Sequence, residues 1–166
     1  MSHFKQYLPL CWFAENPLDL PASISFFKQN LFFYFGLELF TQINMIDAHE
    51  ALLEVTIETS LTLLFVAIVL FLNKSFHAYI PIATAVLFTE NIVAVFGLPT
   101  MIWLTMTEHE LSYLTMFLLV IWDFALMAYI FQKCLGINLL AGWIVSIIYF
   151  FSTYGAAYSI TFFILG

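Results

Sequence analysis

The chain has 166 residues, of which 63% are hydrophobic and only 9% are charged, and its formal net charge is −7. A soluble domain carries about 25% charged residues and is about half apolar, so this composition excludes a soluble globular protein. The acidic balance also excludes a nucleic-acid-binding protein, because no basic patch exists to neutralise phosphates.

Residues 1–23 precede the first long apolar stretch and contain three prolines, which exclude one continuous helix. The apolar patch at residues 7–13 is too short for a secretory signal and is followed by Glu15 and Asp19 rather than by a cleavage site. The aromatic content of this region favours a segment that lies on the membrane surface. We expect a cytoplasmic interfacial segment over residues 1–23 and a transmembrane domain over residues 24–166.

Five apolar stretches follow, each with the roughly 20 residues that a helix needs to cross the hydrocarbon core. Short polar sequences separate them. The sequence therefore predicts an all-α fold, a polytopic membrane helical bundle of about five transmembrane helices. The expected spans in chain order are residues 24–46, 52–72, 79–104, 112–131 and 139–165.

The lysines predict the orientation of this bundle. In a five-span arrangement all of them fall on one side of the membrane. The positive-inside rule then places the N-terminus in the cytoplasm and the C-terminus outside. We expect a multi-pass protein of the cell inner membrane. The lysines are Lys5, Lys28, Lys74 and Lys133.

Five carboxylates lie within the apolar stretches, where an ionisable side chain is energetically costly. At about 1.5 Å of rise per residue, Glu90 and Asp123 lie near the midplane and Glu38 and Glu58 at a common depth in the outer half. Glu54 is shallower and shares a helical face with Glu58. We expect two pairs, Glu38 with Glu58 and Glu90 with Asp123.

No Lys or Arg lies at these depths, and all four histidines lie outside the spans. An ionised acid at a helix centre costs about 2.5–3.5 kcal/mol and protonating a Glu at pH 7 costs roughly 3–4 kcal/mol, so burial favours neutral carboxyls. Three interpretations stay open. The acids hydrogen-bond across helices as part of the packing, they line a proton or cation pathway, or a partner protein brings a Lys or Arg.

Two polar loops, DAHE and EHE, contain His49, Glu50, Glu108 and His109. If the loops meet, these residues are weak candidates for a divalent metal site or a pH sensor. Neither loop has a recognised spacing of metal ligands, and polar loops between spans are usually solvated. We expect no metal and no cofactor.

No catalytic signature is present: the sequence contains no Gly-rich phosphate loop, no nucleophile elbow and no His within a span. Glu90 and Asp123 are formally a pair for an intramembrane aspartyl protease. Their contexts, FTENIV and IWDFAL, do not match the motifs of such enzymes. The sequence predicts a protein that is not an enzyme.

The stretch NPLDLPAS at residues 16–23, the element FGLP at residues 96–99 and the five-span architecture resemble bacterial inner-membrane proteins related to the Yip (Ypt-interacting protein) domain family. Eukaryotic members of that family are membrane-trafficking adaptors, and the resemblance implies no catalytic residues. It implies a fold of membrane helices and partners that are other membrane proteins.

We therefore predict a structural or interaction component of the inner membrane, whose partners are the lipid bilayer and other membrane proteins or further copies of itself. The alternative is a proton- or cation-conducting subunit that uses the intramembrane carboxylates. A conductor needs water to reach Glu90 and Asp123, whereas a scaffold needs a dry, close-packed interior.

Overall fold

The computed structural model describes residues 3–107 and 109–165, and every regular element in that part of the chain is a helix. The all-α prediction is confirmed. The elements in chain order are α1 His3–Tyr7, η1 Leu8–Trp12, η2 Pro17–Asp19, α2 Ile24–Ile43, α3 Ala48–Leu72, η3 Phe76–Ala78, α4 Tyr79–Thr107, α5 Glu110–Leu135, α6 Leu139–Phe150, the π-helical turn η4 Phe151–Gly155 and α7 Ala156–Leu165.

Local sequence signals fix several helix ends. The Ser23 side chain accepts a hydrogen bond from the backbone N–H of Phe26 at 3.3 Å, and the Asn138 side chain accepts one from Ala141 at 2.8 Å. These N-caps satisfy donors that have no partner inside the helix. Gly136 follows α5 with a φ of 65°, a left-handed conformation that ends the helix.

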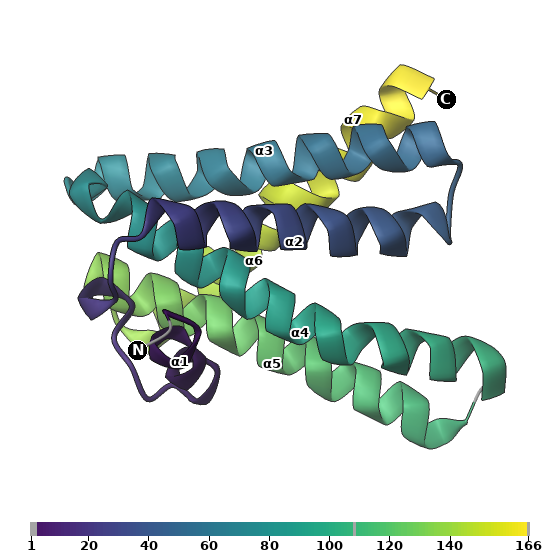
Figure 1. Ribbon diagram of the computed structural model, residues 1–166, viewed down its shortest axis with the longest axis horizontal. Coiled ribbons are helices and arrows are strands. Elements are labelled where there is room, and N and C mark those ends of the chain that lie inside the picture. The colour runs from purple at the N-terminus through teal and green to yellow at the C-terminus, as the bar shows by residue number, and fades with distance from the viewer. Residues whose placement is uncertain (1–2, 108, 166) are drawn as a thin grey trace.

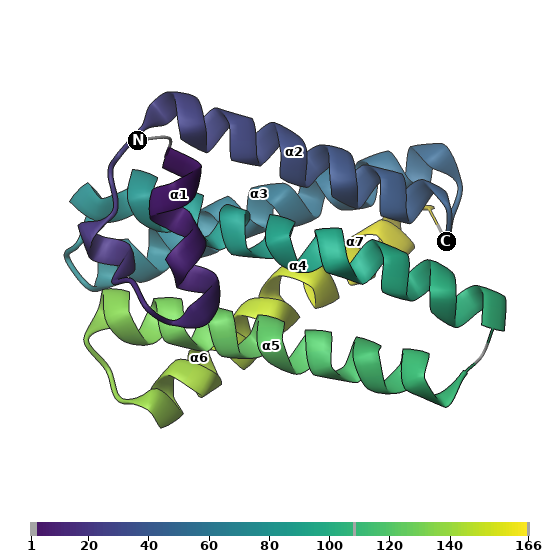
Figure 2. The same cartoon turned by 60° about the horizontal axis from the view of Figure 1, so that its bottom comes forward.

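The long helices form two hairpins and one crossing element (Figure 1). One hairpin is α2 with α3, the other is α4 with α5, and they diverge toward the end that carries their tight connections, on the right of Figure 1. The continuous run α6–η4–α7 begins against α5 and ends against α3, so it crosses from one hairpin to the other (Figure 2). The chain therefore packs most tightly at the opposite end.

Within the described residues, four helical stretches are long and apolar enough to cross a membrane. They match the second to fifth spans expected from the sequence. The first expected span forms α2, a 20-residue helix that is not among the four. Its turns carry Lys28, Asn30 and Glu38, which make it the most polar of the long helices. The four stretches are Ala48–Leu72, Phe76–Thr107, Glu110–Leu135 and Leu139–Leu165.

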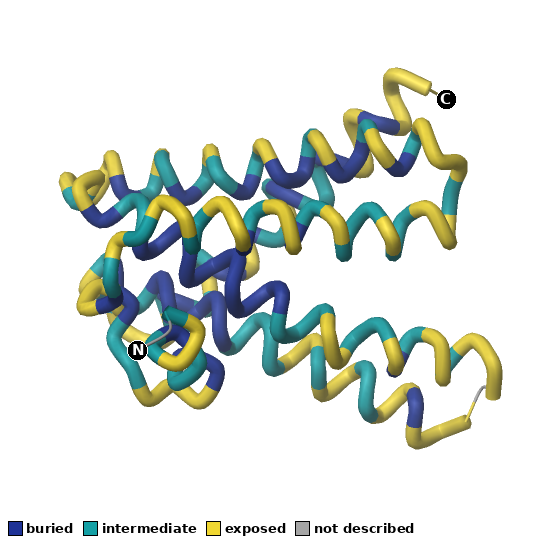
Figure 3. The backbone as a smooth tube through the Cα atoms, in the orientation of Figure 1, coloured by how far each residue is buried: buried dark blue, intermediate teal, exposed yellow. Residues whose placement is uncertain are grey.

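The first half of α4 lies at the centre of the fold. Every residue from Pro81 to Asn91 is buried, whereas most residues of the second half are partly or fully exposed (Figure 3). A helix that is buried on all sides is packed by neighbours in every direction. Helices α2 and α5 flank this half, so α4 determines where the other helices can lie.

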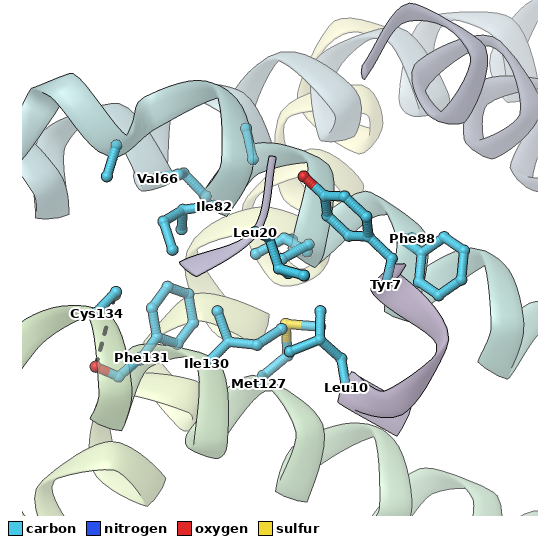
Figure 4. Close-up of a cluster of buried hydrophobic side chains, with 14 of the residues drawn as sticks. Tyr7, Leu10, Leu20, Val66, Ile82, Phe88, Met127, Ile130, Phe131 and Cys134 are labelled. Atoms are coloured by element: carbon cyan, nitrogen blue, oxygen red, sulfur yellow. Dashed lines mark hydrogen bonds between the residues drawn. The ribbon is translucent and has the colours of Figure 1, made fainter. Parts of the chain in front are cut away.

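The N-terminal segment contributes to this core instead of lying free of it. Tyr7 and Leu10 are fully buried and join Phe88 of α4 and Met127 of α5 in one apolar cluster (Figure 4). Helices α4 and α5 are adjacent at this cluster, so the N-terminal segment packs over the contact between them. Its outward face still presents Trp12 and other apolar side chains.

Hydrogen bonds hold this segment in place. The indole N–H of Trp122 donates to the carbonyl of Cys11 at 3.1 Å, and the Tyr129 hydroxyl donates to the carbonyl of Glu15 at 3.0 Å. Burial raises the pKa of the Cys11 thiol to about 11. The thiol is therefore protonated and unreactive at neutral pH.

Gly142 permits the close approach of α6 to α5. A Cβ at this position would lie 2.7 Å from the carbonyl oxygen of Ala128 and 3.1 Å from Cβ of Gln132. No such obstacle surrounds Gly36, which is inside α2 with nothing within 4 Å of its Cβ position. Small residues at helix contacts let membrane helices pack backbone to backbone.

We expect Gly142→Ala to destabilise the protein by about 1–3 kcal/mol, because α5 and α6 must move apart. Gly36→Ala is the matched control and should be neutral or stabilising, since alanine is favoured over glycine inside a helix by about 1 kcal/mol. The measurement is the temperature at which half of the detergent-solubilised protein loses its monodisperse size-exclusion peak. A lower temperature for Gly36→Ala than for Gly142→Ala would contradict the packing described.

Candidate functional site

A pocket of about 330 Å³ opens between α2, α4 and α5, beside the junction of α6 with η4. Glu90 lies eleven residues after Tyr79, the start of α4, and Asp123 lies thirteen residues after Glu110, the start of α5. At about 1.5 Å per residue the pocket is about 16–20 Å from those helix starts, in the middle of the apolar helices. The lining residues are Glu38, Thr41, Glu90, Val93, Ala94, Gly97, Leu98, Met101, Met116, Leu119, Val120, Asp123, Phe124, Phe150 and Tyr154.

Three carboxyl groups from three helices face this pocket: Glu38 from α2, Glu90 from α4 and Asp123 from α5. Glu90 and Asp123, which were expected to form a pair, both line this one pocket. Glu38, which the sequence analysis paired with Glu58, is a third member of the same wall. No lysine, arginine or histidine is among the lining residues, so nothing in the pocket offsets negative charge.

Glu90 is held by two tyrosines. The Tyr149 hydroxyl donates to Oε1 at 3.0 Å, and the Tyr154 hydroxyl donates to Oε2 at 3.2 Å. Glu90 is only 5% exposed. A buried acid with both oxygens hydrogen-bonded avoids the cost of an unpaired polar group, so these tyrosines are the reason that Glu90 is tolerated here.

The π-helical turn explains how both tyrosines reach one carboxyl. Tyr149 and Tyr154 are five residues apart, and in a regular α-helix that spacing would turn them about 140° away from each other. In η4 the backbone N–H of Ala156 bonds the carbonyl of Phe151, the i to i+5 pattern of a π-helix. That pattern lays residues five apart on one side. Single π-turns of this kind are frequent at functional sites.

Glu58 is satisfied by a third tyrosine. Tyr34 of α2 donates its hydroxyl to Oε1 of Glu58 on α3, and both side chains are about 1% exposed. The same Tyr34 oxygen lies 3.3 Å from the Tyr154 hydroxyl. The α3 face that carries Glu54 and Glu58 is buried. This is the expected arrangement, because exposing these acids to hydrocarbon would cost free energy.

Asp123 has an unsatisfied atom. Its Oδ1 is buried and has no hydrogen-bond partner in the part of the chain that the structure describes. Such an atom is costly unless a bound group supplies the missing interaction. Asp123 also lines the pocket, so a ligand there would lie next to this carboxyl group.

The loop residues named as metal candidates are not brought together. His49 lies in the first turn of α3 and His109 directly precedes α5, and the starts of these two helices lie apart in both Figure 1 and Figure 2. His109 caps α5, its Nδ1 accepting from the backbone N–H of Leu111 at 3.1 Å. Glu108 lies outside the described residues, Glu50 is partly exposed on α3, and the described residues contain no group of three or more His, Cys, Asp or Glu that could hold a metal.

Sequence reasoning found the carboxylates but not most of their donors. Tyr34 stands four residues before Glu38 on one face of α2, but its hydroxyl donates to Glu58 on α3, which the periodicity of one helix does not predict. Tyr149 and Tyr154 carried no signal, since α-helical periodicity separates them. The π-turn that unites them has no marker in the stretch FSTYG.

Glu90→Ala should destabilise the protein more than Asp123→Ala, because only Glu90 accepts two tyrosine hydroxyls. Each buried hydroxyl left without a partner costs about 1–3 kcal/mol. Glu90→Gln should recover most of the loss, since its amide oxygen still accepts. Melting temperatures of the three variants in one detergent test this order, and equal shifts for the two alanine variants would refute it.

Comparison with known proteins adds nothing to this geometry. No family model, no curated protein and no solved structure matches the chain. The resemblance to Yip-domain proteins accordingly stays an expectation drawn from two short motifs. The function must be argued from the pocket itself.

Proposed function

We propose that this chain is an integral membrane protein that binds a hydrophobic organic cation in the acidic pocket. The observation that carries the proposal is the convergence of Glu38, Glu90 and Asp123 on one 330 Å³ pocket without any basic residue in its wall. Three carboxyl groups create a site for positive charge, and Oδ1 of Asp123 has no hydrogen-bond partner among the described residues. The proposal develops the alternative from the sequence analysis, a proton- or cation-conducting subunit, by naming the class of cation and its pocket.

The apolar part of the pocket supports an organic cation over a bare metal ion. Apart from the acids, the wall consists mainly of aliphatic, Met and aromatic side chains. Phe124, Phe150 and Tyr154 present rings that attract organic cations, and Met101 and Met116 adapt to irregular shapes. Ca²⁺ needs about six to eight oxygen ligands, and the described carboxyls form no such cluster.

A second cavity adjoins the pocket. This cavity of about 260 Å³ between α2 and α4 shares Thr41, Leu98 and Met101 with the first. Both cavities are lined by α2 of one hairpin and α4 of the other, the two hairpins that diverge in Figure 1. A ligand with a charged head and an apolar body fits this pair, with its head at the carboxyls.

Charge balance predicts that a proton leaves when the cation enters. Adding an uncompensated charge to a low-dielectric site is expensive, and a carboxyl that gives up its proton offsets that charge. Protons and the cation therefore compete for the same acids. A scaffold, the function that the sequence analysis placed first, would need no pocket between its helices.

Tetraphenylphosphonium tests the proposal, because it is hydrophobic, permanently charged and free of exchangeable protons. We expect the purified protein in a non-ionic detergent to bind it, with affinity that rises from pH 5 to pH 8. Asp123→Asn and Glu38→Gln should each raise Kd at least about tenfold, equivalent to about 1.4 kcal/mol. Equilibrium dialysis with the radiolabelled cation measures this.

Glu54→Gln is the matched control, since Glu54 is a buried acid on α3 that does not line the pocket. It should bind the cation like the unaltered protein. Binding that is independent of pH, or that Asp123→Asn and Glu38→Gln leave unchanged, would overturn the proposal and favour the scaffold function with its Yip-like interactions.

We also propose that α2 crosses the membrane as a fifth span, with the N-terminus in the cytoplasm and the C-terminus outside the inner membrane. This is supported by the lysines: Lys28 at the start of α2, Lys74 after α3 and Lys133 near the end of α5 belong to one end of the bundle (Figure 2). Loops with Lys face the cytoplasm in most membrane proteins.

Fusions at the C-terminus test this orientation. Alkaline phosphatase, which is active only outside the inner membrane, should be active there, whereas a green fluorescent protein fusion should be dark. The same pair of reporters fused in the α2–α3 connection should behave identically, because an N-in α2 puts that connection outside. Fluorescence at either position would mean that the orientation or the number of spans is wrong.

A further inference from the structure

A continuous chain of oxygen atoms, each within hydrogen-bonding distance of the next, links the α3 side of the protein to the pocket. It runs from Glu58 through the Tyr34 hydroxyl to the Tyr154 hydroxyl, 3.3 Å away, and on to Oε2 of Glu90 at 3.2 Å. Glu58 does not line the pocket, and Glu90 does. The chain therefore connects a buried acid outside the pocket with one inside it.

Proton counting gives this chain two complete arrangements. Each tyrosine hydroxyl has one hydrogen to donate. If Glu58 is ionised, Tyr34 donates to it, Tyr154 donates to Tyr34, and protonated Glu90 donates to Tyr154. If Glu90 is ionised, every donor reverses: Tyr154 donates to Glu90, Tyr34 to Tyr154, and protonated Glu58 to Tyr34. Both arrangements contain the same number of protons.

We propose that Tyr34 and Tyr154 relay a proton between Glu58 and Glu90. In the direction away from the pocket, the O–H bond of Glu90 breaks as Tyr154 gains its proton, Tyr154 passes its own to Tyr34, and Tyr34 passes its own to Glu58. Three O–H bonds break and three form, both tyrosines stay neutral, and one negative charge moves from Glu58 to Glu90. The step needs no further reactant.

The ionisable side chains around this chain carry no positive charge. They are Glu54 on α3, Glu38 on α2, Asp123 on α5 and Tyr149 on α6. Glu54 is one turn from Glu58 on the same buried face, but Glu58 has its one hydrogen bond among the described residues with Tyr34. The hydrogen-bonded route therefore ends at Glu58.

The relay gives the proposed cation site, on which its physiological use rests, a second carboxyl that can take the displaced proton. A cation in the pocket covers the open side of Glu90, so the displaced proton cannot leave that way. Glu58 lies between α2 and α3 and outside the pocket wall. The displaced proton is then held on Glu58, away from the bound cation.

Hydrogen–deuterium exchange of the Glu58 carboxyl tests the relay without any cation. At pH 5 a protonated carboxyl gives an infrared C=O band that shifts in D₂O, and the band that disappears in Glu58→Gln identifies Glu58. Glu58 is about 1% exposed, so we expect its deuterium to arrive through the relay. Tyr154→Phe and Tyr34→Phe should slow this exchange at least about tenfold, because phenylalanine cannot pass a proton.

Tyr149→Phe is the matched control: it also removes a hydroxyl that donates to Glu90, but it leaves the chain intact. Its Glu58 exchange should match that of the unaltered protein. Tyr154→Phe carries the test if Tyr34→Phe does not fold, because Tyr154 keeps its ring contact with Phe150. Unchanged exchange in Tyr154→Phe, or equal slowing in Tyr149→Phe, would overturn the relay. Neither result depends on whether tetraphenylphosphonium binds.

Discussion

Carboxyl groups in the middle of apolar helices must find hydrogen-bond donors, and in this protein tyrosine hydroxyls supply them. Tyr34 ties α2 to α3 through Glu58, and Tyr149 and Tyr154 tie the α6–η4 run to α4 through Glu90. Lipid offers no alternative donor, so each bond also fixes how its helix is rotated. The relative placement of four helical segments follows from these contacts.

The fold separates a packed end from an open one. At the packed end the N-terminal segment, the first half of α4 and the last turns of α5 form the apolar core shown in Figure 4. Toward the other end the hairpins diverge (Figure 1), and the α4 wall of the acidic pocket begins at Glu90, near the end of the buried run of this helix. A rigid base beneath a pocket holds its charged groups at fixed distances, which a binding site requires.

Within this frame the acids have different tasks. Glu90 is structurally satisfied and faces the pocket, Asp123 faces the pocket with an unsatisfied oxygen, and Glu58 is satisfied outside it. The carboxyl group of Asp123, with one unsatisfied oxygen, is suited to contact a ligand. The carboxyl group of Glu58, which is bonded to Tyr34, is suited to exchange a proton. The division explains how one small bundle tolerates so many acids within its apolar helices when no basic residue lines the pocket.

The sequence by itself determined what depends on one helix at a time. The run of apolar residues predicted helices near the observed bounds, the position of Glu90 and Asp123 along their helices predicted a common depth, and the lysines marked one end of the bundle. Each of these follows from length, rise per residue and composition. None needs knowledge of a neighbouring helix.

Only the tertiary structure decided which groups meet. Glu38 joins the pocket of Glu90 and Asp123 because α2 packs against α4, and Tyr7 enters the core because its segment folds back over α4 and α5. Tyr149 and Tyr154 converge on Glu90 through a π-turn that α-helical periodicity does not anticipate. The physical reason is that contacts between helices depend on their rotation and register, which packing sets after each helix has formed.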